Sequence, residues 1–79
     1  MSSIDRHVSK RLREARNTAG LTQQFVARKL GLTFQQVQKY ENASNRISAG
    51  RLYQLSGILD VPVGYFFEGL ARDRQAKGA

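Results

Sequence analysis

The sequence predicts an all-α domain. Apolar residues recur at spacings of three and four, which place them on one face of an α-helix. Long stretches in which Val, Ile or Thr alternate with polar residues, the pattern of a half-buried strand, do not occur. Glycines recur along the chain and interrupt the periodic pattern, so the helices are expected to be short.

One domain is expected from 79 residues, because compact domains contain at least about 50 residues and typically about 100 to 150. We assign residues 1–70 to this domain. Residues 71–79, ARDRQAKGA, show no apolar periodicity and are predicted to form a flexible basic tail.

The first predicted helix ends at Gly20, which suits the left-handed position after a helix. Ser3 or Asp5 can cap its start. Its inward face comprises Val8, Leu12, Ala15 and Ala19.

Two shorter helices are predicted next. Thr22 is a suitable N-cap for a helix that runs through Leu30, and Gly31 ends that helix. Thr33 then caps a third helix, which ends near Asn42.

A fourth helix is expected to begin after Ser48 and to end before Pro62, because the residue before a proline avoids the α region. Gly57 weakens this helix by up to about 1 kcal/mol relative to alanine. A short fifth helix, Val63 to Phe67, would pack Phe66 into the core.

The net charge is large for a small domain, with 13 Lys and Arg against 6 Asp and Glu, or +7. Such a field attracts polyanions, nucleic acid before an anionic membrane. A membrane-surface role is disfavoured because the cations are spread over several predicted helices instead of one amphipathic face. The alternative is that the charge serves solubility alone.

Other functions are disfavoured by what the sequence lacks. It has no cysteine and only one histidine, His7, which we expect on the surface without a metal. No nucleophile, base and acid cluster together, so we expect neither an enzyme nor a cofactor. No apolar run approaches 18 residues and no signal peptide is visible, which favours a cytoplasmic protein.

The segment from Gln23 to Tyr40, QQFVARKLGLTFQQVQKY, has the spacing of a helix-turn-helix. Ala27 is small where two helices cross, Gly31 supplies the turn, and Val37 anchors the next helix. In this motif the second helix is held out for the major groove of DNA.

The surrounding residues extend the match. They are Arg11-Leu12-Arg13, Arg16, Gly20-Leu21-Thr22-Gln23, Ala27, Leu30-Gly31, Val37, Tyr40-Glu41-Asn42, Leu52, Leu55 and Leu59-Asp60-Val61. From about Val8 to Leu70 the chain resembles the Cro/C1-type (phage repressor, XRE-like) helix-turn-helix family. This resemblance implies a compact five-helix, lambda-repressor-like DNA-binding domain and a role in transcription regulation.

One face of the third helix carries donors without any acid. Relative to Val37, a step of about 100° per residue turns Gln35 and Lys39 away from the core, and Gln38 lies beside them. Gln can bond adenine and Lys can bond guanine. The predicted base-reading residues are Gln35, Lys39, Gln38 and Phe34. Phe34 could instead cover the edge of the core, and the whole face could simply be solvated.

Phosphate contacts are expected on both sides of the reading helix. Thr22 and Gln23 lie at the start of the second helix, where free backbone N–H groups can bind an anion. The resemblance also implies that Gln23 contacts the DNA backbone, because the matching residue of the family does so. The other candidates are Gln36, Asn42, Asn45 and Arg46. Gln36 could instead flank the core, and some of the Asn residues could only form turns.

Arg16 and Glu41 resemble the buried ion pair of the family, a structural role. The family usually has glycine after Glu-Asn, where this chain has Ala43. Either Asn42 takes the left-handed conformation there, or the turn is reshaped.

The fifth helix offers three large apolar groups, Val63, Tyr65 and Phe67, as the seam of a homodimer on double-stranded DNA. Such a dimer would bind a palindromic operator. We expect no small-molecule ligand domain. The alternative function is that of an antitoxin, which binds a toxin protein and its own operator.

Overall fold

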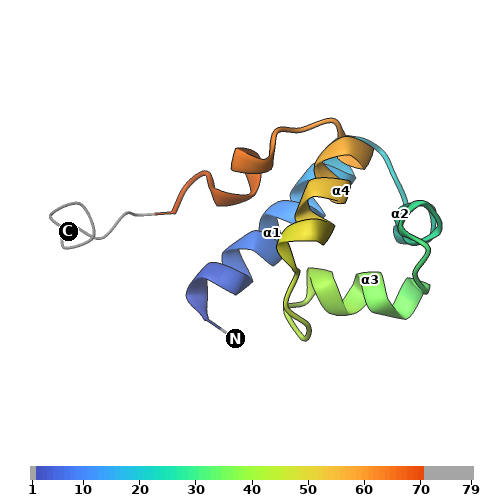
Figure 1. Ribbon diagram of the computed structural model, residues 1–79, viewed down its shortest axis with the longest axis horizontal. Helices are drawn as coiled ribbons and strands as arrows, with labels where there is room; N and C mark the ends of the chain where they lie inside the picture. Colours follow the sequence, from blue (N-terminus) through green and yellow to red (C-terminus); the bar gives the residue numbers. More distant parts are fainter. Residues whose placement is uncertain (1, 71–79) are drawn as a thin grey trace, which may run out of the picture.

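A computed structural model describes residues 2–70, and the predicted basic tail lies outside these described residues. In chain order the elements are α1 (Ser3–Thr18), α2 (Gln23–Leu30), α3 (Phe34–Glu41), α4 (Ala49–Leu59) and the 3-10 helix η1 (Val63–Phe67). The described part contains no strand, so the all-α prediction is confirmed. Figure 1 shows α3 at one edge of the molecule, away from η1.

The last element is a 3-10 helix, so the prediction of five α-helices is wrong and four are present in residues 2–70. The Tyr65 N–H donates to the carbonyl of Pro62 at 2.9 Å, and the Glu68 N–H donates to that of Tyr65 at 3.3 Å. Pro62 and Glu68 are both extended. The segment between them is too short to favour α-helical hydrogen bonds over the tighter i to i+3 type.

Each α-helix begins at a hydroxyl side chain that accepts the N–H three residues later, and these caps are Ser2, Thr22, Thr33 and Ser48. The cap of α1 is therefore Ser2, and neither Ser3 nor Asp5 holds that position. Asp5 is the reciprocal partner in a capping box, since its carboxylate accepts the Ser2 N–H at 3.3 Å.

The turn after α3 has a left-handed residue at Ala43 (φ 64°), whereas Asn42 has φ −99°. Of the two alternatives for this turn, a left-handed Asn42 is therefore not the one adopted, and Ala43 takes the left-handed conformation instead. The Ser44 and Asn45 N–H groups both donate to the Lys39 carbonyl, at 2.9 and 3.1 Å. These bonds close the end of α3 and hold Ala43 in a conformation that favours glycine.

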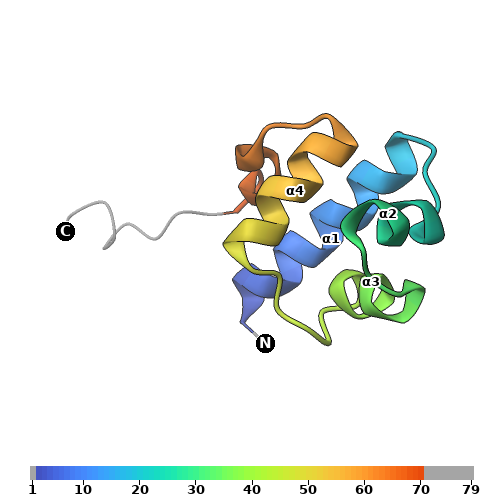
Figure 2. The same cartoon turned by 45° about the vertical axis from the view of Figure 1, so that its right-hand side comes forward.

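The core takes at least one fully buried side chain from every helix, namely Leu12, Val26, Val37, Leu55 and Phe66. Of the inward positions predicted for α1, Ala19 is exposed because it lies at the C-cap. Figure 2 shows α1 running through the middle of the domain, with the other helices around it. Within residues 2–70, no helix combines the length and the apolar character needed to cross a bilayer.

Candidate nucleic-acid interface

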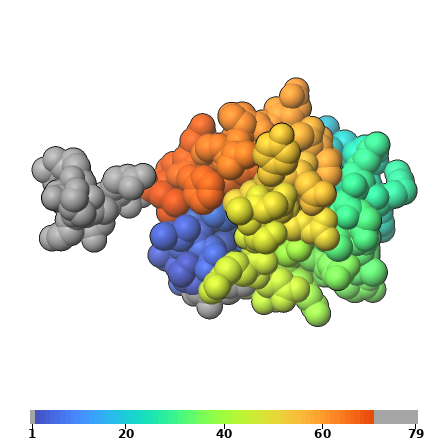
Figure 3. All heavy atoms as spheres, in the orientation of Figure 1, coloured from blue at the N-terminus to red at the C-terminus, as the bar shows by residue number. Residues whose placement is uncertain are grey.

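The outer face of α3 is formed by Gln35, Gln38 and Lys39, all exposed, while Val37 on the opposite face is fully buried. This arrangement follows from the helical spacing, because Gln35 and Lys39 are each two residues from Val37, about 200° around the helix, and Gln38 lies beside them. α3 and the loop after it form one edge of the molecule in the space-filling view (Figure 3). Base reading by these three side chains remains a prediction.

The first turn of α3 contains the two residues for which the sequence left alternatives. Phe34 is half-buried and does not belong to the partly buried apolar side chains that pack against the core, so part of it is accessible. The Gln36 side chain caps its own helix, because its Oε1 accepts the Thr33 N–H at 2.8 Å. This capping box was missed in the sequence, although Thr33 followed by Gln36 is its usual signature.

Arg16 and Glu41 form a bidentate ion pair between α1 and the end of α3. The Arg16 Nε donates to Oε2 at 2.6 Å and Nη2 donates to Oε1 at 3.0 Å. The two side chains are only 12% and 3% exposed. The remaining Nη1 donates to the Leu21 carbonyl at 2.8 Å, so the arginine also holds the loop before α2.

Gln23 joins the same cluster. Its Nε2 donates to Oε1 of Glu41 at 2.9 Å, which ties the start of α2 to the end of α3. An amide nitrogen has two hydrogens, and this bond uses one of them. The second hydrogen of this amide can therefore still donate to a phosphate, as predicted. The bond to Glu41 was not predicted.

A polar hollow of about 210 Å³ lies where these three helices meet, and its lining consists of Arg13, Gln23, Gln38, Glu41 and Asn42. Arg13 was not among the predicted site residues. Its position one helical turn before Arg16 could have indicated it, since residues three apart lie on the same side of a helix. The hollow brings an additional cation next to the predicted reading face.

The loop after α3 lies close to the start of α1. Arg46 is highly exposed, and its Nε is 3.4 Å from Oδ2 of Asp5. The hydrogen bond from the Ser2 side chain, with a smaller contribution from Arg46, lowers the pKa of the Asp5 carboxyl below its usual value. Asn42, Asn45 and Thr22 are exposed as well.

The proposed dimer residues divide into two kinds. Val63 and Phe67 are 38% and 40% exposed. Tyr65 is half-buried because the guanidinium of Arg11 lies 3.7 Å from its ring centre. His7, which was expected on the surface, is half-buried too, with its Nε2 2.6 Å from the carbonyl oxygen of Glu68.

The sequence also matches known proteins. The helix-turn-helix family pattern matches residues 12–66. A transcriptional regulator in the ATPase CF(0) region of Rhodospirillum rubrum is 49% identical over 69 residues, which cover 87% of this chain and 64% of that protein. An HTH-type transcriptional regulator of Sinorhizobium medicae is 47% identical over 75 residues, or 95% of this chain and 54% of the relative.

A third relative, an HTH-type transcriptional regulator of Rickettsia conorii, is 44% identical over 70 residues, covering 89% of this chain and 56% of its own length. The chain thus spans about half to two thirds of the length of these relatives. The family match includes the whole of α2, α3 and α4, together with both members of the Arg16–Glu41 pair. On these grounds the chain belongs to the Cro/C1-type (XRE-like) helix-turn-helix family.

Proposed function

We propose that this chain is a cytoplasmic, sequence-specific transcriptional regulator that inserts α3 into the major groove of double-stranded DNA. The observation that supports this function best is the outer face of α3. Gln35, Gln38 and Lys39 are exposed there without an acid among them. These donors match the acceptors that bases present in the major groove.

The interface divides into base-reading and phosphate-binding parts. Gln35, Lys39, Gln38 and Phe34 read base edges. The phosphate-binding residues are Thr22, Gln23, Gln36, Asn42, Asn45 and Arg46. The two parts differ physically, because base contacts discriminate among sequences whereas phosphate contacts fix the position of the protein on the duplex.

The regulator acts as a homodimer on a palindromic operator. Val63 and Phe67 are exposed apolar residues of η1. In Figure 1, η1 lies on the other side of the domain from α3. A two-fold dimer places its recognition helices about 34 Å apart, one turn of DNA. The alternative function of an antitoxin gains no support from the relatives, which are named transcriptional regulators.

Selection of bound sites from random duplex DNA tests the function. An enriched site with two related halves is expected, and enrichment without any shared sequence would contradict specific recognition. On the best site, Gln35→Ala or Lys39→Ala should cost about 1 to 3 kcal/mol and relax the preference at one or two base pairs.

The matched control is Lys10→Ala, which removes an exposed cation from α1 instead of α3. It should leave the sequence preference intact. If the Gln35 and Lys39 variants also keep the full preference of the parent protein, α3 is not the reading helix.

A further inference from the structure

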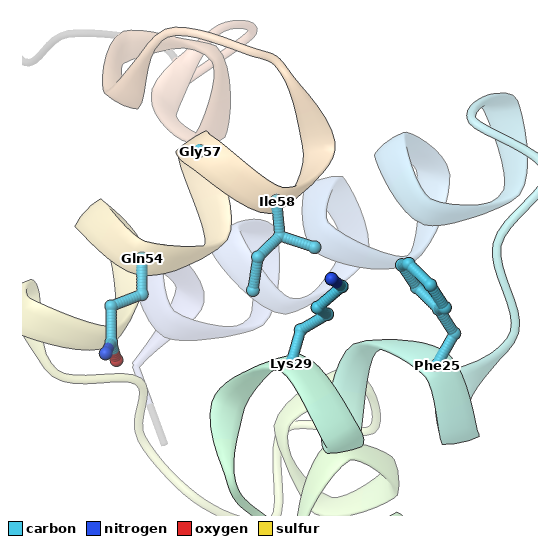
Figure 4. A pocket seen from close by; sticks show the side chains of 5 residues that line it. All are labelled: Phe25, Lys29, Gln54, Gly57 and Ile58. Carbon is cyan, nitrogen blue, oxygen red and sulfur yellow. The ribbon is translucent and has the colours of Figure 1, made fainter.

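A groove of about 540 Å³ separates α2 from α4, and its lining consists of Phe25, Lys29, Gln54, Gly57 and Ile58. Figure 4 shows Phe25 and Lys29 projecting from α2 toward α4, and Ile58 projecting from α4 toward them. Phe25 and Ile58 are only partly buried, so the domain leaves apolar surface accessible in the groove. The predicted DNA-reading residues of α3 do not line it.

Gly57 keeps one wall of this groove open. It lies inside α4 and is exposed, and a Cβ added there would meet no atom within 4 Å. A glycine inside a helix costs about 1 kcal/mol relative to alanine. Neither a positive φ nor close packing within the domain requires glycine at this position. Its absent side chain leaves room for a group from outside.

The groove has a positive rim. The Arg28 guanidinium carbon and the Lys29 Nζ each lie 5.5 Å from the centre of the Phe25 ring. Among residues 2–70, the ion pairs of the structure involve neither of these cations. The sequences of α2 and α4 contain no Asp or Glu. A ligand of this groove would therefore supply the negative charge that pairs with Arg28 and Lys29.

These features identify the kind of partner. A second copy of the chain has a net charge of +7 and the same cations, so two such grooves would repel. Residues 71–79 contain three Lys and Arg and one Asp, so their charge does not complement the rim either. DNA would place phosphates against the apolar Phe25 and Ile58.

We infer that the groove docks an acidic amphipathic helix of a partner protein. Apolar side chains of that helix rest on Phe25 and Ile58, its backbone approaches closely over Gly57, and its carboxylates face Arg28 and Lys29. Binding of a helix in a groove by its apolar face is a common mode of peptide recognition. This inference does not depend on the DNA-binding proposal.

Two synthetic helical peptides test the docking. One has Leu at positions i, i+4 and i+7 with flanking Glu, and its twin has Lys in place of every Glu. Mixed with the full chain, the Glu peptide should shift NMR signals of the five residues that line the groove. The Lys peptide should bind about tenfold more weakly or not at all, because its charges repel the rim.

Matched variants locate the site. Gly57→Leu fills the groove and should weaken binding of the Glu peptide about tenfold, whereas Gly50→Leu, the same change on an exposed residue of the same helix, should not. Lys29→Glu should weaken it similarly, whereas Lys10→Glu on α1 should have a smaller effect. If Gly57→Leu does not fold, the Lys29→Glu variant still tests the site.

Several results would overturn the inference. They are no binding of the Glu peptide at NMR concentrations, equal binding of both peptides, equal effects of the two glycine variants, or signal shifts centred on η1. Operator binding is measured in parallel. Gly57→Leu should leave it unchanged, and a parallel loss of DNA binding would instead assign the groove to DNA.

Discussion

Arg16 and Glu41 join the middle of the domain to the end of the predicted reading helix through two parallel hydrogen bonds of 2.6 and 3.0 Å. A glutamate in the last turn of a helix opposes the helix dipole. Here the guanidinium compensates that charge, and the Gln23 amide adds a third donor. The orientation of α3 therefore depends on this cluster as well as on apolar packing.

Arg16→Ala or Glu41→Ala should each destabilise the domain by about 3 to 5 kcal/mol, because each leaves a buried charge without its partner. The double variant should lose less than the sum of the two. Urea unfolding measures these losses. The pair of Arg46 and Asp5, whose arginine is exposed, is the matched control, and Arg46→Ala should cost no more than about 1 kcal/mol. Losses equally small at Arg16 would contradict a structural role for the buried pair.

Ala43→Gly should stabilise the domain by up to about 1 kcal/mol, since glycine adopts a φ of 64° without the steric cost that alanine bears. Ala49→Gly is the opposite control, because Ala49 lies in a helix where glycine is unfavourable. Thermal or urea unfolding measures whether each variant is more or less stable than the parent protein. A destabilising Ala43→Gly change would mean that residue 43 continues α3 in solution.

The Asp5 carboxyl should titrate below the usual Asp pKa, mainly because the Ser2 side chain donates a hydrogen bond to its charged form. A pKa lowered in the folded state means that the contribution to stability is present above the ordinary value of about 3.9 and disappears as the pH falls through the folded pKa. Carbon NMR of the carboxyl group measures the shift. Ser2→Ala should raise the Asp5 pKa more than Arg46→Ala does, and the reverse order would make the ion pair the main cause.

Arg46→Ala should weaken binding to all DNA sequences alike. It should also lower the salt slope by about one unit per half-site, because each neutralised phosphate releases about 0.9 counterion. Gln23→Ala carries no charge change, so it should reduce affinity with little effect on the slope. Binding isotherms at several salt concentrations separate the two. An unchanged slope for Arg46→Ala would place this side chain off the phosphates.

Phe67→Asp should dissociate the proposed dimer, because it puts a charge into an apolar seam. Tyr53→Asp is the control, since Tyr53 is 75% exposed and lies on α4 outside that seam. Sedimentation, together with binding to a duplex with two half-sites, measures the effect. Tyr65→Asp is a poorer test, because the Tyr65 ring lies under Arg11 and its loss would also disturb the fold. If Phe67→Asp leaves association unchanged, the dimer uses another face.

Short-range signals in the sequence located most of the elements. Thr22, Thr33 and Ser48 cap helices as predicted, and Gly20 and Gly31 both have positive φ. These features could be predicted because a cap or a turn depends on residues only a few positions apart. The 3-10 geometry of η1 was not predicted. The position of a short helix in the sequence does not indicate whether its N–H groups donate three or four residues back.

By itself, the sequence determined where most of the helices lie and the donor-rich outer face of α3, because helical period and side-chain chemistry are local properties. Only the tertiary structure decided the contacts between distant polar groups, such as Gln23 with Glu41 and Arg46 with Asp5. It also placed Arg11 over Tyr65 and opened the groove at Gly57. An exposed polar side chain has many partners of suitable chemistry, and the choice among them depends on where the helices cross, which no short-range pattern specifies.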